Sequence, residues 1–151
     1  MFSLNTSAQY ITNTDYSHIV SVFRDTNGSF GLALTQDYEK FYMGLEVENL
    51  YNPNYFMMFN FLCSAGYNVR GNDWVLRFGG RLGFANVNYK ARRPAIGGEV
   101  SLEQYIDKSN SIYLGVKVTS DYYINYHNLE TNELENGFIS KLFFRVGYKI
   151  N

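Results

Sequence analysis

The feature that most constrains the fold of this chain is a two-residue alternation of apolar and polar side chains. It is clearest in residues 110–126, "NSIYLGVKVTSDYYINY", where Leu114, Val116 and Val118 share one parity and Lys117 has the other. Successive side chains of a strand point to opposite faces, so the pattern predicts a strand with one apolar face. Helical three-to-four spacing is almost absent from the chain. The alternation therefore indicates an all-β fold.

The same alternation recurs along the chain and predicts about eight strands in a single domain, residues 1–151. The first strand is expected at residues 2–10. In residues 17–35 the central "DTNG" leaves two alternatives open, a β-bulge within one strand or a hairpin turn. The remaining expected strands are residues 40–48, 54–68, 74–84, 99–106, 110–126 and 141–150.

The polar faces of these strands carry charges of both signs, which suits the inside of a closed barrel. A barrel of about eight strands has an interior that side chains fill, and buried charges there must be paired. Glycines on the same faces would leave room for long arginine side chains. The predicted lumen charge network consists of Glu46, Glu48, Arg77, Arg81, Glu99, Glu103, Lys117, Lys141 and Arg145.

Lys117 provides the sharpest expectation within this network. If Val116 and Val118 face lipid, the Lys117 ammonium enters a narrow lumen and needs a carboxylate partner. The preceding strand offers Glu99 and Glu103 in the matching parity. We expect one of these two carboxylates to be shared between Lys117 and a second base, either Arg145 or an arginine of residues 76–82.

The expected connections differ between the two rims of such a barrel. The rim that carries the N-terminus is expected to have short turns, at residues 35–40, 69–73 and 107–110. The opposite rim is expected to have the two longest polar segments among its connections, which are residues 12–17, 50–54, 86–98 and 127–136. Short turns on one rim and longer loops on the other are typical of outer-membrane barrels.

On these features the chain resembles the small eight-stranded outer-membrane proteins of Gram-negative bacteria, the group that includes OmpX, NspA and the OmpA transmembrane domain. The alternation, the loop asymmetry and the closing strand "LFFRVGYKIN" carry the resemblance, although the chain ends in Asn151 where such proteins end on an aromatic residue. The resemblance implies a closed antiparallel up-and-down transmembrane β-barrel in the outer membrane. It also implies a structural or adhesive surface role, with outer-membrane lipids, lipopolysaccharide and loop-bound proteins as partners.

Some small barrels are enzymes: lipid A deacylases of the PagL type carry a catalytic His-x-Ser motif near the outer rim, and the sequence can be compared with this motif. His127 occupies a comparable place, but Leu129 stands where the nucleophile belongs. Ser120 and Ser140 are too distant along the chain to be assigned by motif. We therefore expect no enzyme. No cofactor or metal site is expected either, because histidine and cysteine are too sparse.

The basic residues Lys90, Arg92 and Arg93 form a short group at the expected outer rim. Arginine suits lipopolysaccharide phosphates, so these residues are candidates for that contact, with a solvated loop as the alternative. A net charge of -1 gives no reason to expect nucleic acid binding.

Two alternatives to an outer-membrane barrel without enzymatic activity stay open. One is a soluble β-barrel that encloses a small apolar ligand, with the valine and phenylalanine face turned inward. The other is a lipid A-modifying enzyme of the outer membrane. Residues 1–10 lack the basic and apolar regions of a secretory signal peptide, which leaves a cytoplasmic chain and a processed chain both possible.

Overall fold

The computed structural model describes residues 16–52, 56–87, 91–107, 109, 111–127 and 133–150. These residues form eight β-strands, and no helix among them is long and apolar enough to cross a membrane. The strands are β1 (Ser17–Arg24), β2 (Phe30–Asp37), β3 (Phe41–Asn52), β4 (Phe56–Arg70), β5 (Trp74–Val87), β6 (Ala91–Tyr105), β7 (Ile112–His127) and β8 (Leu134–Ile150).

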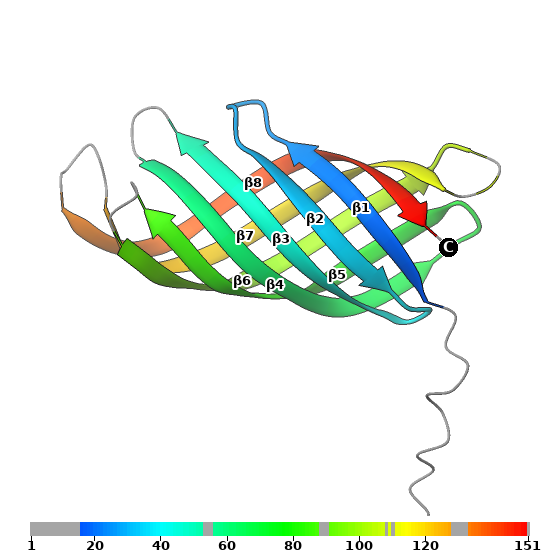
Figure 1. The fold of residues 1–151 in the computed structure, drawn as a ribbon, viewed down its shortest axis with the longest axis horizontal. Helices are drawn as coiled ribbons and strands as arrows, with labels where there is room; N and C mark the ends of the chain where they lie inside the picture. The colour runs from blue at the N-terminus through cyan, green and yellow to red at the C-terminus, as the bar shows by residue number, and fades with distance from the viewer. Residues whose placement is uncertain are drawn as a thin grey trace, which may run out of the picture.

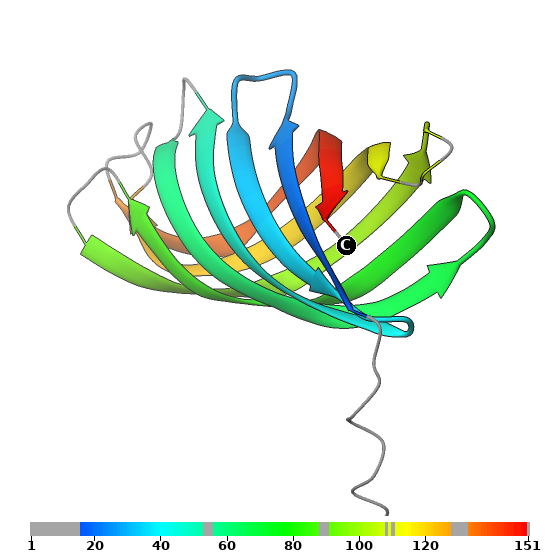
Figure 2. The same cartoon turned by 45° about the vertical axis from the view of Figure 1, so that its right-hand side comes forward.

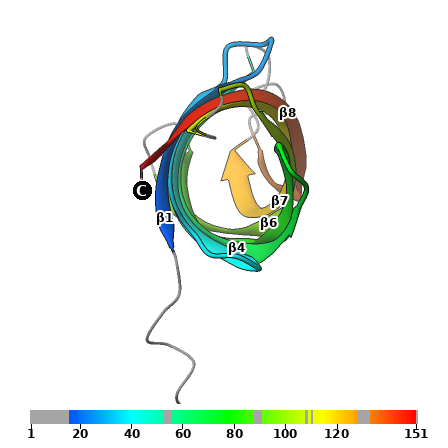
Figure 3. The same ribbon diagram turned by 90° about the vertical axis from the view of Figure 1, so that its right-hand side faces the viewer.

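Each strand pairs antiparallel with the next, and β1 pairs with β8 to close the sheet. Viewed along the barrel axis, the ribbon forms a complete ring (Figure 3). The closed up-and-down barrel predicted from the alternation is confirmed. Figure 1 shows that the strands lie strongly tilted to the long axis of the barrel.

The register of the strands accounts for this tilt. Cross-strand partners followed from His18 through β2 to β7 lead to Ser140 on β8. Ser140 lies four residues before Phe144, which pairs with Arg24, so Ser140 is level with position 28. Following the paired residues once around the barrel therefore leads from position 18 to the level of position 28. The stagger of the sheet is thus ten residues. For eight strands of ordinary spacing, this stagger corresponds to a tilt of about 43°.

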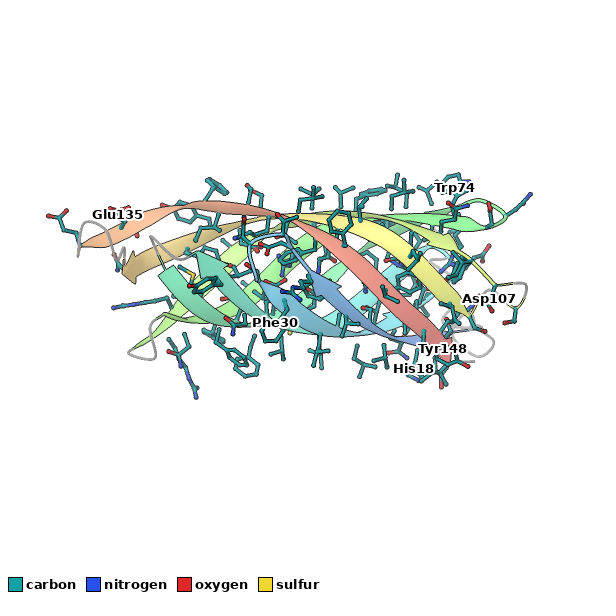
Figure 4. The ribbon with its side chains drawn as sticks, turned by 90° about the horizontal axis from the view of Figure 1, so that it is seen from above. His18, Phe30, Trp74, Asp107, Glu135 and Tyr148 are labelled. Carbon is teal, nitrogen blue, oxygen red and sulfur yellow. The ribbon has the colours of Figure 1, made fainter. Side chains whose placement is uncertain are left out.

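The two rims of the barrel differ in shape. At one rim, here called the inner rim, β1 begins, β8 ends, and the hairpins β2–β3, β4–β5 and β6–β7 turn back (Figure 2). At the other, the outer rim, the hairpin of β1 and β2 stops short because these strands have 8 residues each, against 16 in β7 and 17 in β8. Phe30, at the outer end of β2, accordingly lies about midway along the barrel (Figure 4).

The "DTNG" segment is a hairpin turn between β1 and β2. The Asp25 carboxylate accepts hydrogen bonds from the N–H groups of Asn27 and Ser29, and Gly28 adopts a φ of 98°, in the left-handed region that favours glycine. Residues 17–35 therefore contain parts of two strands. The strand expected at residues 2–10 lies outside the described residues.

The expected loop at residues 86–98 is largely wrong, because β5 continues to Val87 and β6 begins at Ala91. Of the loop expected at residues 127–136, His127 lies in β7 and residues 134–136 lie in β8, whereas residues 128–132 lie outside the described residues. Ser17, which was expected in a loop of the opposite rim, begins β1 at the inner rim instead, and residues 12–15 lie outside the described residues. Proline and glycine produced the error at residues 86–98. Pro94 pairs with Phe84 within the sheet, and a Cβ on Gly97 would lie 2.2 Å from Asp121 Oδ1, so this glycine makes room for a lumen side chain.

The apolar parity of the strands faces outward and the polar parity faces the lumen. Leu114, Val116, Phe144 and Val146 are exposed on the outer surface, whereas Lys117 is completely buried. The alternative with the valine and phenylalanine face turned toward an enclosed ligand is therefore wrong. In Figure 4, the side chains along the outside of the barrel are mostly carbon.

Two clusters of apolar side chains face the lumen. The outer apolar cluster includes Phe23, Leu50, Tyr123 and Phe143. The inner apolar cluster consists of Ile19, Val75, Tyr105 and Tyr113, near the inner rim. Buried charged side chains pack between and against these clusters.

Candidate functional site

The candidate site is this charged section of the lumen, built from inward-facing residues of β2 to β8. It contains two linked groups of ion pairs, one centred on Arg81 and the other on Glu103. All the expected network residues face the lumen, but they fall into these two groups and a separate pair at the outer end.

The Arg81 group brings four carboxylates onto one guanidinium. Arg81 lies 3.0 Å from Glu46, 2.5 Å from Asp121 and 3.6 Å from Glu99, and it also contacts Glu48. These residues come from β3, β5, β6 and β7, so their side chains meet across the barrel. Together they tie distant parts of the wall to one central cation.

Lys117 is the second cation of this group. Its Nζ donates to both oxygens of Glu46 at 2.6 Å and lies 2.9 Å from Glu99. The ammonium also sits 4.6 Å from the centre of the Phe23 ring, within the range of a cation–π contact. Glu99 is thus shared between Lys117 and Arg81, and it accepts a 2.6 Å hydrogen bond from the Tyr42 hydroxyl.

The Glu103 group lies closer to the inner rim. Glu103 contacts Arg77 and accepts a 2.7 Å hydrogen bond from Arg145, so it does not pair with Lys117. Arg77 also lies 3.2 Å from Asp37, which binds the partly exposed Arg70 at 2.5 Å. This group is anchored to β1, because Arg145 also donates to the Ser21 hydroxyl at 3.0 Å.

Lys141 belongs to neither group. Its ammonium lies 3.2 Å from Asp25 in the β1–β2 turn and 3.3 Å from the carbonyl oxygen of Tyr51. Burial raises the pKa of Asp25, but hydrogen bonds from Ser29 and Lys141 outweigh it and hold this pKa below its usual value. Lys141 therefore fastens the short hairpin to the long strand β8.

Sequence reasoning missed several lumen residues that strand parity could have revealed. Asp121 shares the parity of Lys117, and Asp37 shares that of Thr35, but Asp37 was assigned to a turn. Tyr42 and Asn60 were overlooked because uncharged polar residues gave no signal. Asn60 donates to Glu48 at 3.3 Å and to the Tyr123 hydroxyl at 2.7 Å, which extends the network toward the outer apolar cluster.

The residues considered for catalysis and lipopolysaccharide contact lie elsewhere. Ser120 and Ser140 face outward, with their hydroxyls 2.9 Å apart. His127 ends β7 opposite Leu134, and Leu129 lies outside the described residues. Arg92 is exposed and Arg93 half-buried in β6 near the outer rim, whereas Lys90 is not described. Within the described ranges, no group of histidine, cysteine and acidic residues is placed to hold a metal ion.

The outer surface has the dimensions of a lipid-facing band. On β5 the exposed aromatic residues Trp74 and Phe84 stand ten residues apart, with the exposed Phe78 and Leu82 between them. Ten residues of a strand tilted by about 43° rise about 24 Å, close to the apolar band of about 25 Å in transmembrane barrels. An apolar exterior of this height around a charged, packed lumen defines a small transmembrane β-barrel.

Comparisons with known proteins agree with this class. The crystal structure of Neisserial surface protein A (NspA) matches with a TM-score of 0.64 and 14% sequence identity, over 89% of this chain and 94% of that one. A de novo designed transmembrane β-barrel matches with a TM-score of 0.51 and 12% identity, over 91% of this chain and 95% of that one. No protein-family model and no curated protein matches the sequence. The chain therefore has the fold of a small NspA-like outer-membrane barrel.

Proposed function

We propose that the protein resides in the outer membrane of a Gram-negative bacterium, where it serves a structural or surface-binding role. The observation that carries the proposal is the exposed apolar band around a buried, ion-paired lumen. Such a distribution is stable when lipid surrounds the barrel and unfavourable when water does. The similarity in fold to a Neisserial surface protein supports the same location.

The filled lumen favours a role other than conduction. Side chains of the inner and outer apolar clusters and of the ion-paired groups are buried inside the described barrel, which supports a packed lumen. In the proposed orientation, the outer rim is the part of the barrel that faces the cell exterior. We therefore place its binding function, adhesive or lipid-directed, on the residues of that rim.

Fractionation tests the location directly. The native protein is expected in the outer-membrane fraction and, after extraction, to stay monodisperse only with detergent present. A monodisperse full-length protein in buffer without detergent would overturn the membrane assignment.

The basic residues of β6 are the proposed contact with lipopolysaccharide. The double substitution Arg92→Gln and Arg93→Gln is expected to weaken binding of purified lipopolysaccharide to the detergent-solubilised barrel about tenfold, because each arginine offers a fork of donors to phosphate. Raising the salt concentration should shrink this difference. Lys40→Gln, at the β2–β3 turn of the inner rim, is the control. Equal binding by all three proteins would contradict the assignment.

We propose no catalytic role for His127. Since the sequence after it lacks a nucleophile, His127→Ala should leave lipid A acylation unchanged in cells that express the protein. Mass spectra of lipid A from cells with the wild type, the variant and an empty vector provide the check. A change on expression that the variant reverses would reveal an enzyme.

A further inference from the structure

The ion pairs of the lumen do not balance. The Arg81 group sets four carboxyl groups, those of Glu46, Glu48, Glu99 and Asp121, against only two cations, Arg81 and Lys117. All six side chains are buried, with exposed fractions of 8% or less. If every carboxyl group were ionised, this part of the lumen would carry two excess negative charges.

The Glu103 group offsets one of these charges. Its two carboxylates, Glu103 and Asp37, face three cations, namely Arg77, Arg145 and the partly exposed Arg70. The two groups together therefore hold six carboxyl groups and five cations among the described residues. The separate pair of Lys141 and Asp25 is balanced and leaves the excess unchanged.

An excess charge in this group is unfavourable because its side chains are buried away from water. A buried group without a counter-charge usually becomes neutral rather than staying ionised. A single bound positive charge would restore balance. No set of described side chains is placed to hold a metal ion, so a proton is the ligand of matching size and charge.

The hydrogen bonds single out one carboxyl group. Glu46 and Glu99 each contact both Lys117 and Arg81. Glu48 contacts Arg81 and also accepts a hydrogen bond from Asn60. Among the cations of the described residues, Asp121 contacts Arg81 alone, bound to Oδ2 at 2.5 Å, while its buried Oδ1 has neither a hydrogen-bond partner nor a second cation within ion-pair distance.

We propose that Asp121 is a proton-binding site of the folded barrel and holds its proton at neutral pH. The charged and titratable groups around it are Arg81 on β5, Glu46 and Glu48 on β3, Glu99 on β6, and Lys117 and Tyr123 on β7. With this proton the two groups together are neutral. Opening the barrel exposes Asp121 to water, where its carboxyl group ionises above a pH of about 4.

The test measures how stability depends on pH. Because unfolding releases the Asp121 proton, this group makes the unfolding equilibrium constant rise about tenfold per pH unit above a pH of about 4, until the folded protein also loses the proton. Asp121→Asn is an uncharged substitute and should remove this tenfold contribution. Urea titrations of both proteins in lipid vesicles, at a series of pH values with and without EDTA, give the unfolding equilibrium constant. Its slope against pH is then compared between the wild type and Asp121→Asn.

Asp73→Asn, at the exposed β4–β5 turn, is the matched control and should keep the wild-type slope. Equal slopes in wild type and Asp121→Asn would overturn the proposal. An effect of EDTA on wild-type stability would also overturn it, since it would indicate a metal ion in place of the proton.

Infrared spectra keep the proposal testable if Asp121→Asn does not fold. Wild-type barrel at neutral pH should show the C=O stretch of a protonated carboxylic acid in a water-excluded site. Labelling the aspartate carboxyl carbons with ¹³C should shift this band, because the proton is on an aspartate. A missing band, or a band that the label leaves in place, would contradict the assignment.

Discussion

Replacing Arg81 with Met is expected to lower the free energy of unfolding by about 3–5 kcal/mol, the range found when one partner of a buried ion pair is removed. Arg81 is the only cation in contact with Asp121 and Glu48 among the described residues, and it is one of two for Glu46 and Glu99. Methionine fills similar space but leaves Glu46 and Glu99 with Lys117 as their cation, and Glu48 and Asp121 with none among the described residues. Urea unfolding in lipid vesicles at neutral pH measures the change.

Arg92→Met is the matched control for this prediction. Arg92 is exposed on β6 near the outer rim, so the same chemical change there should alter the free energy of unfolding by less than about 1 kcal/mol. If the two variants lost equal stability, the buried network would not be what holds the wall of the barrel together.

Strand parity predicted which residues enter the lumen far better than it predicted their partners. Parity is a property of one strand, and it placed Lys117, Glu46 and Glu99 on the inside correctly. The partners of Lys117 were sought on neighbouring strands, yet it bonds both oxygens of Glu46, 71 residues away on β3. In a narrow barrel, long side chains reach across the lumen, so contacts depend on the register of the whole sheet.

The ends of the strands were harder to predict for a related reason. Glycine and proline ordinarily mark turns, and residues 86–98 contain both. Here Gly97 serves the packing of the lumen, because a Cβ on it would collide with the Asp121 side chain. A Cβ on Gly79, likewise, would lie 2.6 Å from the Tyr42 hydroxyl that binds Glu99. The need for these glycines is set by side chains on other strands, which local sequence patterns do not record.

The second prediction with a large expected effect on stability concerns the outer surface and is tested by Val116→Arg. Val116 is 39% exposed on the outside of β7, four residues from the inner end of that strand, or about 10 Å along the barrel axis at a tilt of about 43°. That depth is close to the middle of an apolar band of about 25 Å. Arginine there should lower the free energy of unfolding in a lipid bilayer by about 2–4 kcal/mol, because its charge would leave water for hydrocarbon.

Ile112→Arg places the same charge on the same face of β7, but at the inner rim, where headgroups and water can solvate it. Its effect should be about 0–1 kcal/mol. Both variants place an arginine on the outer face of β7 and differ in how deep it lies in the bilayer. Measuring both therefore separates the effect of depth from the effect of adding an arginine. A loss at Ile112 equal to that at Val116, or none at either position, would reject the lipid-facing assignment. A graded loss that grows with distance from the rim is the result expected of a surface surrounded by hydrocarbon.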